Sequence, residues 1–255
     1  MSTELTVYTE QVFDPATLPF DDLRWTVDDD SFLLHRVGLS TRTTTVVTSP
    51  GEVGIEIRAL AADADIDLAV AIAVSLGGEV EVEGVLTDDV AAWFGRETRD
   101  QLASSGARAL VALLDRGPME APGPVRSFVF GRRLQFELRG PDFPQRLLER
   151  MRAVQWDVPA KYRDAGVFTI DGDRTRRLAI WIGTEDLVLP NVRFLVLDDG
   201  RDDGHVVVPS EQLPELAGEH ARLLDECQWL VDAFTPEAWA EVLERARAVA
   251  VDPRG

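Results

Sequence analysis

Residues 53–83 read VGIEIRALAADADIDLAVAIAVSLGGEVEVE, and this stretch decides the fold of the first half of the chain. Apolar residues alternate with other residues over 53–60 and 79–83, which predicts a strand at each end. Between them, three aspartates at alternate positions precede an alanine-rich apolar run that ends in two glycines. Early carboxylates complement the helix dipole, and glycine readily ends a helix, so we expect a helix over 63–76. Its apolar residues point in all directions, which favours a strand-helix-strand unit packed on more than one side.

Similar patterns continue on both sides of this unit. Alternation and β-branched residues predict further strands at 5–9, 32–37 and 43–48, and at 167–170, 178–182, 192–197 and 205–208. Pro144 opens an apolar spacing typical of a helix, and Thr235-Pro236 caps an amphipathic helix near the end of the sequence. The expected fold class is therefore α+β, with mainly antiparallel sheets and packed helices.

Turn-forming residues are densest near residue 120. Gly117-Pro118 is followed closely by the run Ala121-Pro-Gly-Pro124, and such clusters interrupt both helices and strands. We place a boundary there, which divides the chain into an N-terminal α+β half, 1–120, and a C-terminal α+β half, 121–255. The length of 255 residues is compatible with one large domain or two small ones.

Three shorter segments carry more specific expectations. Apolar residues at alternate positions around Gly131 predict a β-hairpin over 127–138 whose phenylalanines face the core. Interrupted helical spacing over 87–115 predicts two or three short helices. The single cysteine, Cys227, cannot form a disulfide within the chain, and we expect it to be a small core residue in a helix around 223–231.

The net charge of -19 is unevenly distributed along the chain. Residues 1–125 carry -14, residues 126–177 carry +5, and residues 178–255 carry -10. Strong negative charge disfavours nucleic acid and anionic membranes, and it favours rapid, salt-sensitive association with basic partners. The charge pattern therefore indicates a basic protein partner.

The basic segment 126–177 combines arginines with interspersed aromatic residues. Its arginines are Arg126, Arg132, Arg133, Arg139, Arg146, Arg150, Arg152, Arg163, Arg174, Arg176 and Arg177. This composition is typical of nucleic-acid surfaces, but the overall charge opposes that function. Internal salt bridges to acidic parts of the chain and contacts between subunits are the other interpretations.

Catalytic and cofactor motifs of the common kinds do not occur in the sequence. There is no nucleophile elbow, no glycine-rich phosphate loop with a following lysine, and no paired histidine or cysteine spacing for zinc. We therefore expect no cofactor and no metal. The remaining enzymatic hypothesis is a site near His205 with scattered carboxylates, because histidine titrates near neutral pH.

Aspartate clusters are the candidate binding residues. The cluster over 63–67 lacks the glycine and glutamate that an EF-hand calcium loop requires at its sixth and twelfth positions. Two further clusters are expected to form hairpin turns, since aspartate is a typical turn residue. Exposed carboxylates also steer cationic partners, so we predict both turns as partner-binding sites. Their residues are Asp28, Asp29, Asp30, Asp198, Asp199, Asp202 and Asp203.

No segment has the pattern of a secretion signal or of a membrane-spanning helix, so we expect a cytoplasmic protein that does not enter a membrane. Arginine greatly outnumbers lysine, a bias that we associate with GC-rich bacterial genomes.

The C-terminal fifth of the chain contains HVVVP at 205–209, QLPEL at 212–216 and FTPEAW at 234–239. This order of a strand, a short helix and a Pro-Glu-capped helix resembles the endings of some bacterial immunity-type proteins, which are encoded beside secreted polymorphic toxins. The resemblance implies a non-enzymatic binder that neutralises a toxin. The other non-enzymatic hypothesis is a scaffold or homo-oligomer in which basic and acidic parts of different subunits meet.

Overall fold

The computed structural model describes residues 2–170, 172–198 and 205–253. The chain forms two compact units, Met1–Asp157 (unit 1) and Val158–Gly255 (unit 2). The units divide later than residue 120, because the segment rich in glycine and proline connects two paired strands inside unit 1. Helices and mainly antiparallel strands occur in both units, which confirms the predicted α+β class. Among the described residues, no helix combines the length and the apolar character needed to cross a membrane.

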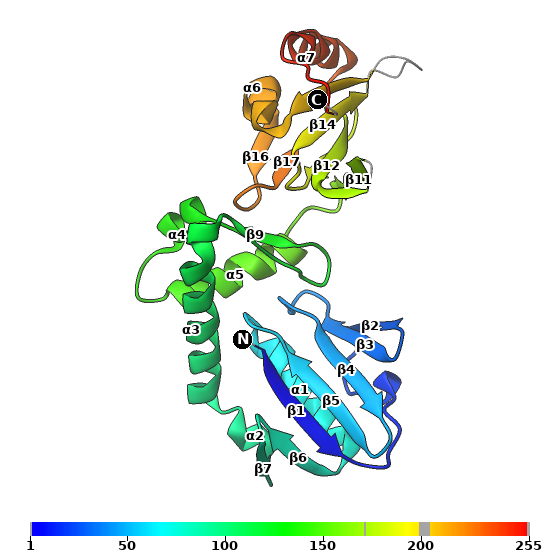
Figure 1. The fold of residues 1–255 in the computed structure, drawn as a ribbon, viewed down its shortest axis with the longest axis vertical. Helices are drawn as coiled ribbons and strands as arrows, with labels where there is room; N and C mark the ends of the chain where they lie inside the picture. The colour runs from blue at the N-terminus through cyan, green and yellow to red at the C-terminus, as the bar shows by residue number, and fades with distance from the viewer. Residues whose placement is uncertain (1, 171, 199–204, 254–255) are drawn as a thin grey trace. The chain divides into compact units, whose positions relative to one another are not determined.

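Unit 1 is built on an antiparallel sheet. Its described strands are β1 (Thr3–Tyr8), β2 (Leu23–Asp28), β3 (Ser31–Arg36), β4 (Thr44–Ser49), β5 (Glu52–Ile57), β6 (Glu79–Val82) and β7 (Val85–Thr87). They lie in the order β2-β3-β4-β5-β1-β6-β7 (Figure 1). Strand β1, the first of the described strands, is therefore internal, with β5 on one side and β6 on the other.

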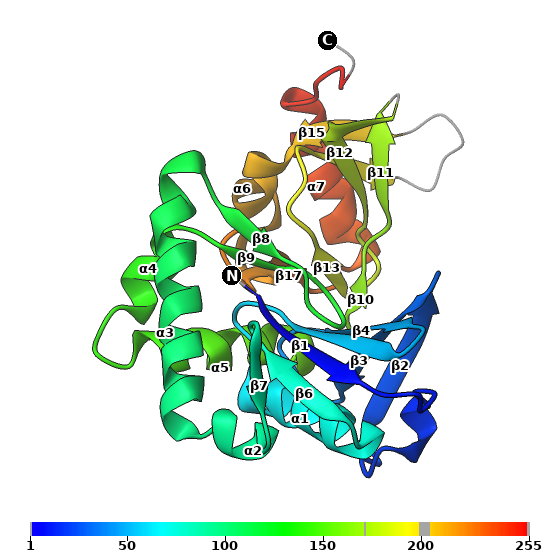
Figure 2. The same cartoon turned by 60° about the horizontal axis from the view of Figure 1, so that its bottom comes forward.

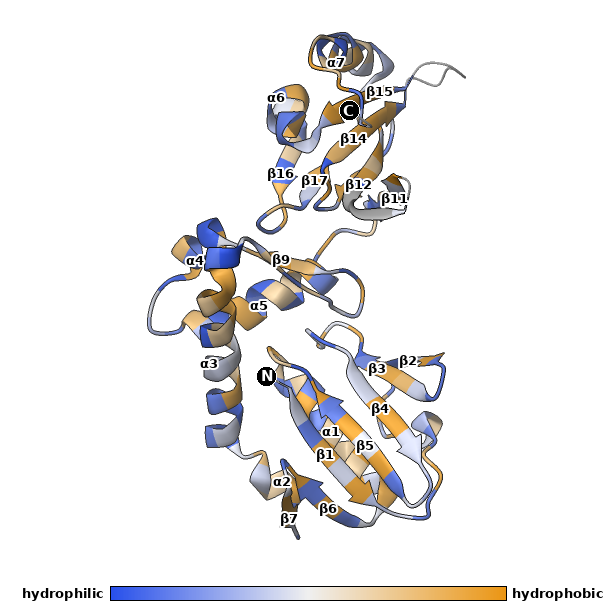
Figure 3. Ribbon diagram, viewed as in Figure 1, coloured by the Kyte–Doolittle hydropathy of each residue, from blue (hydrophilic) through white to orange (hydrophobic). Residues whose placement is uncertain are grey.

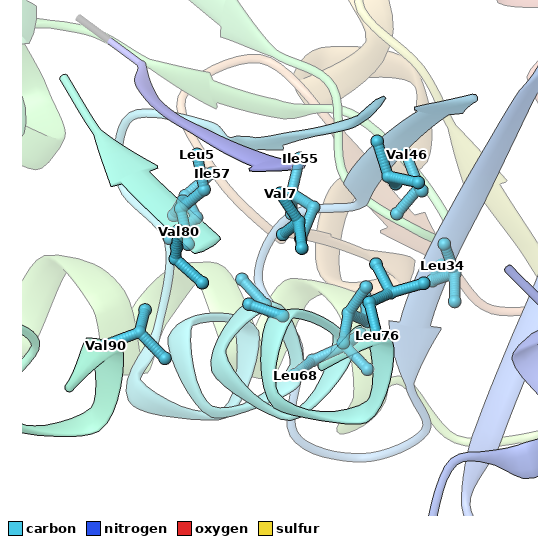
Figure 4. Packing of buried hydrophobic residues seen from close by; sticks show 14 of the residues in the cluster. Leu5, Val7, Leu34, Val46, Ile55, Ile57, Leu68, Leu76, Val80 and Val90 are labelled. Carbon is cyan, nitrogen blue, oxygen red and sulfur yellow. The ribbon is translucent and has the colours of Figure 1, made fainter. Parts of the chain in front are cut away.

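One face of this sheet packs against α1 (Asp63–Leu76), which has the bounds expected from the sequence. The helix ends because Gly77 adopts the left-handed conformation, with φ of 60°. Apolar side chains from alternate strand positions meet the helix and form the core of unit 1 (Figure 4). They include Leu5, Val7, Leu34, Val46, Ile55, Ile57 and Val80.

Asp65 connects the start of α1 to the loop between β3 and β4. One of its carboxylate oxygens accepts hydrogen bonds from the backbone N–H groups of Thr41, Arg42 and Ala62 at 2.8 to 3.2 Å. The side chain is buried, and burial raises the pKa of this carboxyl group. Asp67 points elsewhere, toward Arg99, so these aspartates begin a helix and do not converge on a cation.

The second part of unit 1 is mostly helical. Its elements are α2 (Val90–Trp93), α3 (Arg96–Leu113), β8 (Met119–Ala121), β9 (Phe128–Phe130), α4 (Arg132–Leu138) and α5 (Phe143–Trp156). Helix α3 continues through the serine-glycine site that was expected to interrupt it. Packing favours glycine at position 106, since a Cβ atom would lie 3.1 Å from the backbone nitrogen of Leu60. Close approach between segments thus explains this glycine better than a break in the helix.

The predicted β-hairpin over 127–138 is wrong, because β9 ends at Phe130 and α4 follows after Gly131. Leu134 is buried, whereas Phe136 is 63% exposed and lies beneath the guanidinium of Arg139, 4.0 Å from its ring centroid. Leucines four residues apart lie on one face of a helix, so the alternating pattern was equally compatible with α4.

Unit 2 contains two small sheets. Strands β11 (Val167–Ile170), β12 (Asp173–Ile182), β14 (Phe194–Asp198) and β15 (Val206–Pro209) form one sheet. The other consists of β10 (Arg163–Asp164), β13 (Leu187–Leu189), β17 (Trp229–Val231) and β16 (Ala221–Leu223). A short helix, α6 (Leu213–Ala217), and the terminal helix α7 (Pro236–Ala248) complete the unit, and α7 packs against β15 (Figure 2).

Two expectations for unit 2 have opposite outcomes. The predicted cap of the terminal helix is confirmed, since the Thr235 hydroxyl accepts a hydrogen bond from the N–H of Ala238 at 3.2 Å. The helix expected around Cys227 is wrong, because this residue lies in the turn between β16 and β17. Its N–H group donates to the buried carboxylate of Asp225 at 3.0 Å, which fixes a turn where a helix was expected.

Candidate protein-binding surface

The face of the unit 1 sheet opposite α1 carries a concentration of glutamates. Successive side chains of a strand point to opposite faces, and the alternate positions of β1, β5 and β6 are buried against α1. Figure 3 shows the resulting alternation of hydrophobic and hydrophilic residues along these strands. The residues in between face away from α1. We call the following five the acidic sheet face: Glu4, Glu52, Glu56, Glu79 and Glu81.

The strand register brings these like charges close together. Glu4 of β1 lies directly opposite Glu56 of β5. Tyr8, also on β1, lies between Glu52 of β5 and Glu79 of β6. Residues directly opposite each other in an antiparallel pair have Cβ atoms about 4.5 to 5.5 Å apart, and like charges at that separation repel. The arrangement therefore costs folding free energy in the isolated protein.

Tyr8 reports the negative potential of this face. Its hydroxyl donates a hydrogen bond to Glu81 Oε2 at 3.2 Å. The pKa of Tyr8 is raised above its ordinary value of 10.0, chiefly by the charge of Glu81 and also by that of Glu52. A raised tyrosine pKa means that a further negative charge is disfavoured here, and a positive charge is favoured for the same reason.

Little positive charge compensates the acidic sheet face within unit 1. Among the described residues, the ion pair that reaches it joins Arg58 Nε to Glu56 Oε2 at 3.8 Å. The other four glutamates take part in no ion pair between described side chains at 4.0 Å or less. A cationic ligand would therefore meet carboxylates that are available for pairing.

A hollow lined by both polar and apolar residues lies at the β7 edge of the sheet, on the side where α1 packs. Its volume is about 410 Å³. Val74 and Leu86 line it and are each 62% exposed, while Glu79, Asp88 and Asp89 surround them. Exposed apolar side chains with a polar rim are typical of protein contact sites.

The aspartates predicted from the sequence lie elsewhere. Asp28, Asp29 and Asp30 are exposed at the turn between β2 and β3, separated from the acidic sheet face by β3 and β4. Asp198 ends β14, and its backbone oxygen accepts a hydrogen bond from Trp239 Nε1 at 3.0 Å. The remaining three predicted residues, Asp199, Asp202 and Asp203, lie outside the described part of the chain.

His205 does not form a tight catalytic pair with its nearest carboxylate. Its Nδ1 atom lies 3.9 Å from Asp198 Oδ1, and the imidazole is 58% exposed. That distance is too long for the hydrogen bond through which an orienting carboxylate usually holds a catalytic base. Among the described residues, no group of three or more potential ligands is positioned to hold a metal ion.

A cluster of charged and polar side chains in unit 2 contains residue types that are common in catalytic sites, but their pKa shifts do not suit catalysis. Lys161 Nζ lies 2.8 Å from Asp232 Oδ1 and 3.1 Å from Asp186 Oδ1. The buried Tyr162 donates its hydroxyl proton to Asp232 and accepts a hydrogen bond from Arg222 Nη2 at 2.8 Å. We call these five residues the Lys161 cluster.

The pKa shifts of the Lys161 cluster favour its present charge state. Hydrogen bonds to Asp232 and Asp186 raise the pKa of Lys161, and burial raises the pKa of Tyr162. The hydrogen bond from Lys161 lowers the pKa of Asp232. A general acid or base works best with a pKa near the working pH. Each of these shifts moves the pKa of its group further from neutral pH. The cluster is thus suited to holding β10, β13, β16 and β17 together.

Several arginines of the basic segment are engaged locally. Arg132 pairs with Asp115 at 2.7 Å, Arg152 with Asp157 at 2.6 Å, and Arg126 donates to the backbone oxygen of Val154 at 2.7 Å. The first two contacts agree with the interpretation of internal salt bridges for part of the segment.

The acidic sheet face was missed by reasoning from the sequence. Its signal was present in each strand, since Glu79, Glu81 and Glu83 alternate with valines and Glu52 and Glu56 flank apolar positions. The sequence does not show that these strands are neighbours, because β1 pairs with segments more than 40 residues away.

No family model, no curated protein and no solved structure matches this chain.

Proposed function

We propose that this protein binds a basic protein partner through the acidic sheet face. The observation that carries the proposal is the direct opposition of Glu4 and Glu56, with Tyr8 flanked by two more glutamates. Repulsion between these carboxylates is relieved when a cationic surface docks on them. Binding therefore gains free energy that the isolated fold lacks.

The hollow beside β7 supports a protein partner over a diffuse polycation. Charge attraction mainly raises the association rate, whereas a buried apolar anchor slows dissociation. Val74 and Leu86 offer such an anchor position next to Glu79. A partner with a basic surface fits both features if one apolar side chain reaches around the β7 edge into this hollow.

The finer proposal is that the partner is a toxin and that this chain neutralises it. It is supported by the resemblance of residues 205–239 to immunity-type proteins and by the acidic charge of the chain. Neutralisation requires that the acidic sheet face cover a surface that the toxin needs for its activity.

The experiment compares two variants with the same net charge. The first replaces Glu4, Glu52, Glu79 and Glu81 by glutamine. The matched control replaces Glu211, Glu219, Glu241 and Glu244, which are exposed glutamates of unit 2. The probe is a basic protein that co-purifies from the native host, and its affinity for each variant is measured by isothermal titration calorimetry.

We expect the first variant to bind at least about thirtyfold more weakly than the control, since removing interfacial charge pairs costs about 2 kcal/mol or more in total. For the finer proposal, co-expression of the wild-type chain should rescue the growth of cells that produce the basic partner. Equal affinity of the two variants contradicts binding through the acidic sheet face. Rescue failure with intact binding contradicts neutralisation alone.

A further inference from the structure

Strand β2 forms one edge of the unit 1 sheet and has the features of a pairing surface. Among the described strands, only β3 pairs with it, in unbroken register along its length (Figure 1). It is regular and six residues long. Proline, bulges and lysine usually prevent edge-to-edge pairing, and β2 has none of them. Trp25 and Val27 are 42% and 64% exposed on it.

The hydrogen-bond pattern shows which backbone groups of β2 face outward. Asp28 and Ser31 close a two-residue turn, so these two residues form a hydrogen-bonded pair. The same alternation directs the backbone groups of Arg24 and Thr26 toward β3. At the start of the strand, the N–H of Val37 donates to the oxygen of Asp22 at 2.9 Å, which agrees with this phase. The N–H and C=O groups of Trp25 and Val27 therefore point away from β3, toward the open edge of the sheet.

The sequence of β2 is self-complementary about Thr26. In an antiparallel pair of two copies centred on this residue, Trp25 of each copy lies opposite Val27 of the other. Those are the residues with outward N–H and C=O groups, and such a pair exchanges both hydrogen bonds. Aromatic residues opposite β-branched residues, and threonine opposite threonine, are favourable cross-strand pairs.

Charge selects the same register. With Thr26 at the centre, Arg24 of each copy lies opposite Asp28 of the other, on the sheet face away from α1. A register centred on Trp25 instead places Arg24 opposite Thr26, and one centred on Val27 places Thr26 opposite Asp28. Of these three registers, only the one centred on Thr26 therefore pairs opposite charges within β2.

We propose that two copies of this protein associate by antiparallel pairing of their β2 strands about Thr26. The occupant of this edge is a second copy because each complementary pair is repeated by the two-fold symmetry of such a dimer. The two-fold axis is perpendicular to the sheet, so both acidic sheet faces point in the same direction. This inference is independent of the partner proposed above.

Charge exchange provides a sharp test. Arg24→Asp places aspartates opposite one another at both ends of the pair, and Asp28→Arg places arginines opposite one another. We expect each single variant to raise the dimer dissociation constant at least tenfold. The double variant Arg24→Asp/Asp28→Arg restores both opposite-charge pairs and should recover the wild-type constant. A mixture of the two single variants should form heterodimers.

Sedimentation equilibrium at physiological ionic strength measures these constants, with far-UV circular dichroism to establish that each variant is folded. Hydrogen exchange gives a second readout, in which the amides of Trp25 and Val27 become protected as concentration rises. A wild-type protein that stays monomeric at every concentration contradicts the proposal. So does a dimer that neither single variant weakens, or one that the double variant fails to restore.

Discussion

The acidic sheet face of unit 1 and the Lys161 cluster of unit 2 use charge in opposite ways. In the Lys161 cluster, each carboxylate meets a cation or a hydroxyl donor, at distances such as 2.8 Å between Lys161 and Asp232. On the acidic sheet face, Glu4 meets Glu56, and Tyr8 meets further glutamates. Compensated charges stabilise a fold, whereas uncompensated charges of one sign favour an external partner. We therefore interpret the Lys161 cluster as structural and propose the acidic sheet face as the binding surface.

The largest expected effect concerns Asp65, a buried carboxylate of unit 1 that accepts backbone hydrogen bonds through one of its oxygens. Asp65→Ala leaves the buried N–H groups of Thr41 and Arg42 without their acceptor. We expect the free energy of unfolding of unit 1 to fall by about 3 to 5 kcal/mol in urea denaturation.

The control for this change is Asp67→Ala, which removes the half-exposed ion pair with Arg99. It should cost less than about 1 kcal/mol. Equal losses in the two variants would show that burial and hydrogen bonding do not distinguish these carboxylates.

The next effect tests the Lys161 cluster. Asp232→Asn removes the charge that Lys161 and Tyr162 contact, and we expect a loss of about 1.5 to 3 kcal/mol in unit 2 at neutral pH. Hydrogen exchange detected by mass spectrometry assigns the loss to this unit.

The pH dependence gives a second test of Asp232. Its folded-state pKa is below the ordinary value of 3.8, so the stability it contributes is present above pH 3.8 and is lost as the pH falls through the lowered pKa. The Asp232→Asn variant should lack this part of the acid-induced loss. A variant with unchanged acid sensitivity would show that Asp232 is not the group responsible.

The smallest effect has the opposite sign. Glu4→Gln relieves the repulsion with Glu56, and we expect the free energy of unfolding to rise by about 0.2 to 0.5 kcal/mol at low salt. The gain should shrink at high salt because exposed charges are screened. Glu10→Gln, on the exposed loop after β1, is the control and should change stability less. Destabilisation by Glu4→Gln would contradict an uncompensated acidic face.

The sequence predicted correctly those helix ends that capping residues and glycine determine. Helix α1 has the expected bounds because early aspartates and Gly77 define its ends, and α7 begins at the expected Thr235 cap. The segment 132–138 was misassigned because its apolar spacing suits either a strand or a helix, and packing of Leu134 decides between them.

The candidate surface depended on information that no local pattern contains. Asp28, Asp29 and Asp30 were predicted at a turn, and they lie at one, but they remain a prediction as a binding site. The acidic sheet face exists because β1 pairs with β5 and β6, and the pairing partners of a strand follow from the whole topology. Charge counted along the chain indicated a basic partner without locating its contact surface.

The internal position of β1 has a consequence for synthesis on the ribosome. This strand leaves the ribosome before both of its neighbours, and the later of them, β6, starts at Glu79. At about 5 to 20 residues per second, β1 waits roughly 4 to 14 s before both of its edges are covered. During that interval, Glu4 of β1 and Glu52 and Glu56 of β5 oppose pairing between nascent chains, much as charged gatekeeper residues flank aggregation-prone strands. The same carboxylates would then protect the unfinished protein before they serve the finished one.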